Sequence, residues 1–417
     1  MAGGDRISIL PLEIKISVLS RLDFKDAVRT SAVAHSWRHL WTLLPRLHLH
    51  SFVDLLGLGL RRDFGSDPIW LERVFHLVSS LRGPILDFQL AFYCCPERHS
   101  LLQRLLNLLL QKGDVETLHL QNFNQRCLAV TRLPCFHALK ELDLCYCHLI
   151  LPADFPGFNR LTKLDLIDTL ISSEDNLSLP VNLSFPSLRH LVFTFTDFEG
   201  VPLFYAPCLE KACIFHCDFL NLKPTSEKLA QLILGLVTSV AMASSLTLGF
   251  DALKNFSLVT LPFNFTFPRL RFLSFYLNTD TMDKRMYGAF VWLLKSIPFL
   301  EGLEIELWGD DLSQTNGVAI LMRDLLAKKH DGFACLDRTV RSVAIEMNKL
   351  QVTASITMAQ FFLLNAKLLK ELKIVFATGA EVIPSMIEEL KKVEIISSDA
   401  KVVLFDWINE KNYFEYE

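Results

Sequence analysis

The first part of the chain, residues 5–45, carries three successive apolar patterns with helical spacing. In the first pattern, Ile14, Val18 and Leu22 recur every fourth residue, behind a proline that suits a first helical turn. The second pattern follows Asp23, whose side chain can meet the unpaired N–H groups of a helix start. The third has apolar residues three and four positions apart and comprises Trp37, Leu40, Trp41 and Leu44. We therefore expect three short helices, the last of which ends at Pro45.

Such short helices cannot bury this much apolar and aromatic surface among themselves, so we expect a residual patch that contacts another protein. The segment resembles a plant F-box at Ile9-Leu10-Pro11, Leu19 to Leu22, Lys25 to Ser31 and Trp37-Arg38. F-boxes dock on the Skp-type adaptor of SCF ubiquitin ligases, and the resemblance implies the same role here. The docking residues that it implies are Leu10, Pro11, Ile14, Leu19, Leu22, Val28 and Trp37. The alternative for each residue is a place in the core of the three helices, where helical apolar stripes usually face.

A leucine-rich repeat dominates the middle of the chain. Its template, L-x-x-L-x-L-x-x-N/C-x-L, is met at every position from Leu139 to Leu149. It is met again from Leu188 to Phe198, with Thr196 at the asparagine position, and from Leu209 to Phe219, with Cys217 there. Looser copies are centred on Phe88, Leu118, Leu164, Leu246, Leu273, Leu303, Val343, Leu372 and Val393.

Each such repeat is a short strand with a returning segment, and it buries its apolar side only by stacking on its neighbours. The small Cys or Thr is expected to bond to the backbone where the chain turns. The predicted fold class is α/β: an N-terminal three-helix F-box, then an irregular leucine-rich-repeat solenoid with parallel strands on the concave face. Because Cys147 occupies the turn position, the cluster of Cys145, Cys147 and His148 does not indicate a zinc site. We expect no metal and no cofactor.

Strand alternation places the residues between the template leucines on the outer side of the sheet. Of these, Phe215 and Tyr276 most resemble the aromatic anchors of binding surfaces, and we take them as candidate target-binding residues. Acidic pairs such as Asp143 and Asp165 raise the alternative of acid–base catalysis. Because no nucleophile, metal-ligand set or phosphate-binding glycine loop accompanies them in the sequence, we expect no catalytic residue and a non-enzymatic protein.

Residues 335–400 resemble the FBD module that follows leucine-rich repeats in many plant F-box proteins. The resemblance lies in Cys335-Leu336, a strand pattern at 340–345, an apolar helix at 358–366 and a second strand at 369–374. The segment 348–357 departs from it, because the aromatic-glycine turn usual in the module is missing. The other boundaries that we expect are 5–45 for the F-box, 46–84 for a helical transition, 85–334 for the repeats and 401–417 for a tail.

Composition and charge narrow the class of protein. The 417 residues are 51% hydrophobic and 21% charged, as in folded proteins, and a net charge of −4 gives no basic field for nucleic acid. The uncharged stretch from Leu229 to Phe250 contains several polar residues and divides into a helix and a strand, so we expect no membrane span. The N-terminal residues show no signal-peptide pattern, so the ten cysteines are expected to stay reduced in the nucleus or cytoplasm.

Together these features predict the substrate-recognition subunit of an SCF-type E3 ubiquitin ligase. The F-box would dock a Skp-type adaptor and, through it, a cullin/RING complex, while the repeats would recruit an unknown target protein. The alternatives are an F-box/leucine-rich-repeat scaffold outside any ligase, or a receptor that binds its target together with a small molecule.

Overall fold

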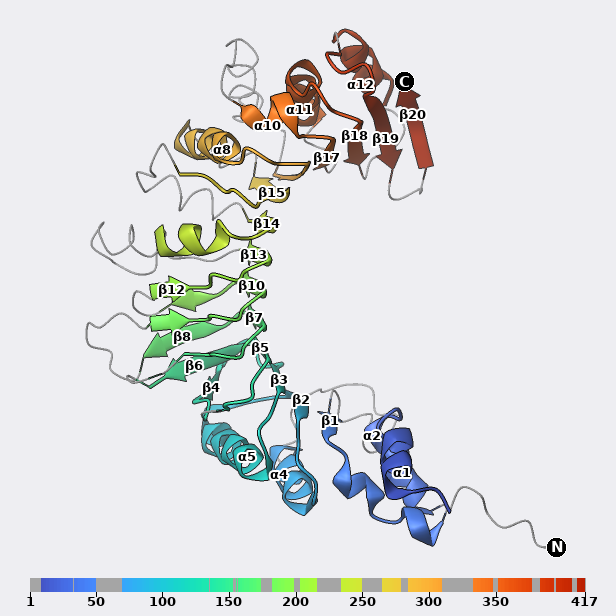
Figure 1. Ribbon diagram of the computed structural model, residues 1–417, viewed down its shortest axis with the longest axis vertical. Coiled ribbons are helices and arrows are strands. Elements are labelled where there is room, and N and C mark those ends of the chain that lie inside the picture. The colour runs from blue at the N-terminus through green and yellow to red at the C-terminus, as the bar shows by residue number, and fades with distance from the viewer. Residues whose placement is uncertain are drawn as a thin grey trace, which may run out of the picture. The chain divides into compact units, whose positions relative to one another are not determined.

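The structure is a computed structural model of the chain (Figure 1). It describes residues 9–32, 34–49, 70–134, 136–152, 155, 157–173, 182–198, 203–215, 234–249, 265–278, 284–309, 333–347, 352–376, 383–393, 395–406 and 411–416. The chain folds as two compact units. The N-terminal unit comprises 1–188 and 194–203, and the C-terminal unit comprises 189–193 and 204–417.

The N-terminal unit begins with helices α1 (Leu12–Leu19) and α2 (Phe24–Arg29). The third apolar pattern forms 3₁₀ turns and not one α-helix. These turns are η2 (His35–Trp37) and η3 (Leu40–Leu43), and a further 3₁₀ turn, η1 (Thr30–Ala32), precedes them directly after α2. An α-helix cannot continue through this segment because His39 has a φ of 69°, outside the right-handed helical region.

A small core holds the F-box elements together. It consists of four buried residues, Leu19, Ala27, Trp37 and Leu44. The ring of Trp41 meets Phe24 edge-on, with ring centroids 5.9 Å apart. Lys15 is also buried, and its ammonium lies 6.0 Å from the centroid of the Trp37 ring. The aliphatic stem of this lysine therefore covers the core from the side of α1.

Beyond the F-box, the N-terminal unit contains a parallel sheet with the strand order β1-β2-β3-β5-β7. Its strands are β1 (Arg46–Leu49), β2 (Asp87–Phe92), β3 (Thr117–Asn122), β5 (Glu141–Cys145) and β7 (Lys163–Ile167). The repeat centres Phe88, Leu118, Leu142 and Leu164 are paired in register from strand to strand, which confirms this part of the alignment. Strand β1 lies in the segment 46–84, for which we expect a helical transition, and no strong sequence pattern predicts this strand.

Helices and a second sheet complete the N-terminal unit. Helices α4 (Trp70–Ser80) and α5 (His99–Lys112) pack together, and the short turn η4 (Pro96–Arg98) precedes α5. The second sheet has the order β11-β8-β6-β4, with β4 (Ala129–Thr131), β6 (Cys147–Leu151), β8 (Leu170–Ser173) and β11 (Asp197–Phe198). Strand β9 (Asn182–Ser184) also belongs to this unit, whereas β10 (His190–Thr194) and β12 (Leu203–Tyr205) include residues of both units.

The chain turns sharply where strands β5, β7 and β10 end. The corner residues have φ values of 52°, 47° and 49° and are Tyr146, Asp168 and Phe195. The residue after each corner is small, polar and buried: Cys147, Thr169 and Thr196. Positive φ is unusual for residues other than glycine, so the repetition of this corner points to one shared turn geometry.

The buried residues after these corners bond to backbone carbonyls of the preceding repeat. Thr169 Oγ1 donates to the carbonyl oxygen of Leu144 at 3.1 Å, and Thr196 Oγ1 donates to that of Leu166 at 2.9 Å. Cys147 Sγ lies 3.9 Å from the carbonyl oxygen of Leu120 in the preceding repeat. The predicted role of the turn position is therefore confirmed at Cys147 and Thr196, whereas Cys217 lies outside the described residues.

The sheet of the C-terminal unit also follows the repeats. Its strands after β10 are β13 (Lys211–Phe215), β14 (Ser245–Leu248), β15 (Phe272–Asn278), β16 (Gly302–Trp308), β17 (Ser342–Met347), β18 (Glu371–Phe376), β19 (Lys401–Asp406) and β20 (Lys411–Tyr416). One row of buried residues crosses these strands in register and contains Ala212, Leu246, Leu273, Leu303, Val343 and Leu372. This row confirms the alignment of these repeats.

The end of the chain differs from the prediction. The centre placed at Val393 is wrong, because Val393 follows helix α12 (Ile383–Lys391) and Leu372 pairs instead with Val402 of β19. The segment assigned to a tail forms β19 and β20, which pair in antiparallel fashion. An antiparallel last strand can pair without a crossover helix, so it completes the sheet within a short stretch of sequence.

Helices cover one side of the sheet in the C-terminal unit. They are α8 (Lys284–Ser296), α10 (Ala334–Arg338) and α11 (Val352–Asn365), and Figure 1 shows them on the same side of the strands. Phe275 of β15 packs edge-on against Phe290 of α8, with centroids 5.4 Å apart. The other side of strands β13 to β18 is called the outer face below.

The uncharged stretch from Leu229 to Phe250 divides as predicted in its described part. Residues 234–240 are helical, and Ser245 begins strand β14. Among the described residues, none of the helices combines the length and the apolar character needed to cross a bilayer.

We predict that Thr196→Val lowers the free energy of unfolding by about 1–2 kcal/mol, because it removes a buried hydroxyl and leaves the Leu166 carbonyl without its donor. Urea denaturation monitored by circular dichroism measures the change. The control is Thr162→Val, which loses a hydrogen bond from a more exposed hydroxyl to the Lys140 carbonyl and should cost clearly less. Equal losses in the two variants would contradict a structural role for the buried turn position.

Candidate functional site

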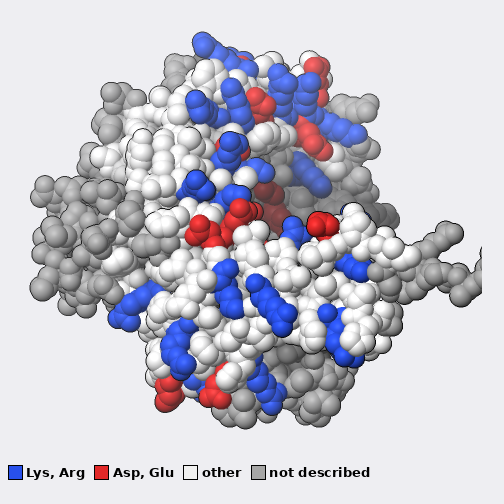
Figure 2. Space-filling model, turned by 60° about the horizontal axis from the view of Figure 1, so that its bottom comes forward, with Lys and Arg blue, Asp and Glu red and all other residues white. Residues whose placement is uncertain are grey.

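Large apolar side chains are exposed on the F-box. Ile14 is 48% exposed and Leu22 is 43% exposed, although both belong to the helical apolar pattern. The exposed set, called the F-box apolar surface, consists of Ile9, Leu12, Ile14, Val18 and Leu22. The region of the F-box at the right of Figure 2 is mainly white, with a few separate charged side chains between the uncharged residues. Exposed apolar sets of this kind mark protein contacts.

The residues that the F-box resemblance implies for docking fall into two groups in the structure. Pro11, Ile14 and Leu22 are exposed, and Leu10 and Val28 are half-buried. Leu19 and Trp37 lie in the core, at 0% and 6% exposure. These last two therefore support the fold of the F-box, and their side chains offer little surface to a partner.

Sequence reasoning left three exposed apolar residues out of the docking set, and one of them, Ile9, is 74% exposed ahead of helix α1. Leu12 is 46% exposed and Val18 is 42% exposed on helix α1. The spacing of four residues from Ile14 to Val18 was a signal that both share one face of the helix. Leu12 carried no comparable signal, because its exposure depends on how the chain enters α1.

A second candidate surface is a hollow on the outer face of the C-terminal unit. Its volume is about 350 Å³, and it crosses strands β14 to β18. Small side chains form much of its lining, namely Ser245, Thr247, Ser274, Gly302, Ser342 and Ala344. Phe272, Glu304, Glu371 and Lys373 also line it. The hollow exists because a run of small residues faces outward between larger ones.

Gly302 permits the shape of this hollow at its Phe272 end. A β-carbon on Gly302 would lie 2.8 Å from Cδ1 of Phe272, which is closer than carbon atoms can approach. The Phe272 ring therefore lies across β16 at Gly302, although Phe272 itself belongs to β15. Glycine in a strand interior commonly marks such a close approach.

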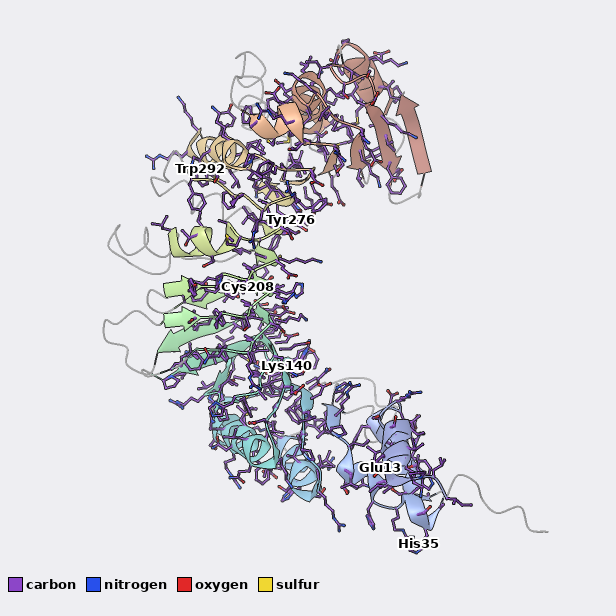
Figure 3. All side chains as sticks on the ribbon, viewed as in Figure 1. Glu13, His35, Lys140, Cys208, Tyr276 and Trp292 are labelled. Carbon is purple, nitrogen blue, oxygen red and sulfur yellow. The ribbon has the colours of Figure 1, made fainter. Side chains whose placement is uncertain are left out.

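The candidate residues Phe215 and Tyr276 meet each other on the outer face. Their ring centroids are 4.6 Å apart and the rings are inclined by 82°. They belong to β13 and β15, and the strand between them continues from β14 into Gly249, which has no side chain to separate the rings. Figure 3 shows Tyr276 on the side of β15 away from Trp292, which lies on α8.

Three carboxylates lie beside this aromatic pair. Tyr276 pairs with Glu306 across β15 and β16, and Glu306 pairs with Glu346 across β16 and β17. The third, Glu304, precedes Glu306 by two residues and so shares its face. Trp308 Nε1 donates to Glu306 Oε1 at 2.8 Å, and the Tyr276 hydroxyl also donates to the Glu306 carboxylate.

The electrostatics of this group follow from burial and from like charges. Burial, the charge of Glu346 and, less strongly, that of Glu304 raise the pKa of Glu306 above its ordinary value, although bonds from Trp308 and Tyr276 oppose the shift. Burial and the neighbouring Glu306 charge raise the pKa of Tyr276 to about 12. The outer face therefore holds negative charge beside aromatic rings at a place where that charge is poorly stabilised.

Asp143 and Asp165 of the N-terminal unit have basic partners instead. His119 Nδ1 lies 3.1 Å from Asp143 Oδ2, and Lys163 Nζ lies 2.8 Å from Asp165 Oδ2. Asp143 and Asp165 therefore lie in ion pairs or hydrogen bonds along the sheet. Their arrangement gives no sign of a matched acid and base around a substrate position.

The cysteine and histidine cluster is arranged for packing. Burial raises the pKa of the Cys147 thiol far above its ordinary value and that of Cys145 to about 11, so neither thiolate is favoured. His148 Nε2 lies 2.7 Å from Ser172 Oγ. Within the part of the chain that the structure describes, no three His, Cys, Asp or Glu side chains are grouped as metal ligands.

We predict that Glu306→Gln raises the thermal unfolding midpoint slightly at pH 7. A carboxyl whose folded-state pKa is raised binds its proton more tightly in the folded state, so it lowers stability once the pH exceeds that pKa. The gain of the variant should shrink as the pH falls through the raised pKa and disappear below about pH 4. Differential scanning calorimetry across this range measures it, with the exposed Glu388→Gln as control. A gain that is the same at every pH would contradict a strained carboxylate at Glu306.

Comparisons with known proteins agree with this arrangement. Residues 7–49 match the F-box domain family. An FBD-associated F-box protein of Arabidopsis thaliana is 30% identical over 184 residues, which are 43% of this chain and 34% of that protein. An F-box/FBD/LRR-repeat protein of the same plant is 32% identical over 173 residues, which are 41% of this chain and 40% of that protein.

A third relative, an F-box protein of Arabidopsis thaliana, is 26% identical over 255 residues, which are 48% of this chain and 52% of that protein. The chain thus matches between about a third and a half of the length of these relatives. The chain contains an F-box and is similar to plant F-box proteins whose names record leucine-rich repeats and an FBD module.

Proposed function

We propose that this protein is the substrate-recognition subunit of an SCF-type E3 ubiquitin ligase. F-box domains generally bind Skp-type adaptors, and the F-box here leaves its apolar surface exposed. That exposure is the single observation on which the proposal depends most. A self-contained helical domain would bury Ile14 and Val18, whereas a docking domain keeps them for its partner.

The proposed mechanism is non-catalytic recruitment. The adaptor joins the F-box to a cullin/RING complex, and the outer faces of the repeats hold the target protein. Tethering raises the effective concentration of target lysines near the ubiquitin-charged partner enzyme. The eight cysteines that the structure describes have free thiols, which supports the further proposal of a nuclear or cytoplasmic location.

We predict that Ile14→Asp weakens binding of a plant Skp-type adaptor at least about tenfold, because it places a charge in an apolar contact. Isothermal titration calorimetry with the purified full-length chain measures the affinity. The F-box should remain folded, since Ile14 is 48% exposed and lies outside the core.

The matched control is Leu368→Asp, because Leu368 is also 48% exposed but lies in the C-terminal unit. It should bind the adaptor as wild type does. Trp37→Ala is a poorer test than Ile14→Asp, since the loss of a core residue would unfold the F-box and weaken binding indirectly. Wild-type affinity in Ile14→Asp would remove the F-box apolar surface from the docking interface.

Recruitment of a target is tested in plant cells by affinity capture while ubiquitination is blocked. A protein captured by the wild-type chain should become more abundant when this gene is lost, and it should be ubiquitinated in a reconstituted ligase. Capture without any change in abundance or ubiquitination would favour a scaffold outside a ligase. Capture that requires an added small-molecule extract would favour a receptor that binds its target together with a ligand.

A further inference from the structure

The outer face of the C-terminal unit contains a hollow next to a group of charged and aromatic residues. This group, called the rim, consists of Glu304, Glu306, Glu346, Tyr276 and Trp308. The hollow is lined by small residues such as Thr247, Ser274 and Ala344. Two residues further along each strand, the next row of outward residues contains Tyr276, Glu306 and Glu346, which are paired side by side on β15, β16 and β17. The two rows are therefore about 7 Å apart along the strands, a distance that a long side chain can span.

The carboxylates of this rim lack a basic partner in the described structure. None of the ion pairs found among the described residues joins Glu304, Glu306 or Glu346 to a lysine, arginine or histidine. A basic residue, Lys373, lines the hollow. Its ammonium lies 4.5 Å from the centroid of the Phe405 ring on β19. Within the described residues, no lysine, arginine or histidine side chain forms an ion pair with the carboxylates of the rim.

This arrangement reduces the stability of the sheet itself. Like charges directly opposite each other on neighbouring strands are destabilising, and Glu306 and Glu346 are such a pair. Local arrangements that lower stability are concentrated at functional sites, where a ligand compensates for them. A bound cation would remove the repulsion, so the free protein is prepared for a basic ligand.

The aromatic residues narrow the chemistry of that ligand. The Tyr276 ring lies beside Glu306, and Trp308 is 53% exposed while its indole N–H is held by the same carboxylate. A planar guanidinium can stack on such rings and donate two parallel hydrogen bonds to carboxylates. An ammonium offers neither the plane nor the fork, so the site fits arginine better than lysine.

We propose that an extended segment of the target lies in the hollow on the outer face of the C-terminal unit and places the guanidinium of an arginine against Glu304, Glu306 and Glu346, beside Tyr276 and Trp308. This inference rests on the proposed function, because it names the chemistry of the recruited protein. The small residues Thr247, Ser274 and Ala344 leave room for the backbone and the neighbouring side chains of that segment. Charge complementarity favours an arginine of the target as the group that contacts these carboxylates. A phosphate or an acidic residue would be repelled by them.

The test uses the labelled full-length chain on an array of acetylated, amidated seven-residue peptide pools. The pools are identical except for the central residue, which is arginine, lysine, citrulline, glutamate or phosphoserine. Citrulline keeps the shape of arginine but has no charge. We expect the arginine pool to retain about tenfold more protein than the citrulline pool, because a charge-assisted hydrogen-bonded pair supplies about that difference.

Matched variants separate the rim from general charge effects. The double variant Glu306→Gln/Glu346→Gln should reduce retention on the arginine pool to the citrulline level. The control Glu388→Gln/Asp399→Asn removes the same charge from exposed residues elsewhere in the C-terminal unit and should bind as wild type does. Equal retention of arginine and citrulline, preference for lysine, phosphoserine or glutamate, or the same loss in the control would overturn the proposal.

Adaptor capture by the same protein sample separates the two proposals. Binding of the Skp-type adaptor without preference for arginine defeats this inference alone. Preference for arginine without adaptor binding defeats the ligase function and leaves an arginine-binding repeat face.

Discussion

The structure depends on one constraint, which is that a repeat strand cannot cover its own apolar side. Each strand must therefore lie in register with the next, so that its inward residues meet those of its neighbour. A shift of one residue would turn Leu273 outward and Ser274 into the core. The turns after the strands enforce this register in the N-terminal unit, because Thr169 and Thr196 each bond to a carbonyl of the preceding repeat. A slipped strand would leave these buried hydroxyls and carbonyls unpaired.

The repeats could be predicted from the sequence because every strand must bury its apolar side in the same way, so the apolar positions recur periodically. The leucines of the template predicted the row from Leu246 to Leu372 residue by residue, and the outward residues followed from simple alternation. The turn position could be predicted for the same reason, since a small polar residue recurs at one place in the template. The centre at Val393 failed because an apolar residue at the end of helix α12 resembled the expected leucine. The true strand, β19, comes only after a further turn.

Other features depend on contacts between distant residues and had no local signal. The third F-box segment has a spacing that fits a helix, yet His39 adopts a positive φ and the segment folds as 3₁₀ turns. The hollow of the outer face depends on Gly302 next to Phe272, two residues from different repeats. The aromatic candidates Phe215 and Tyr276 were found from strand alternation, but their mutual contact over Gly249 required the register. Sequence patterns therefore predicted on which side of the sheet a residue lies. The structure was needed to find which of these residues contact each other there.

The two candidate surfaces differ in the physics of the contacts they offer. The F-box apolar surface offers an apolar contact whose burial favours affinity, and under the proposed function this suits an adaptor that is always the same. The rim around Glu306 contributes less through area than through sign and geometry, because a negatively charged or misplaced group would leave its carboxylates without a basic partner. Discrimination among many targets requires such a penalty for the wrong partner. Under the proposed function, a chain that joins a constant adaptor to a selected target therefore benefits from an apolar contact on its F-box and a charged, hydrogen-bonding contact on its repeats.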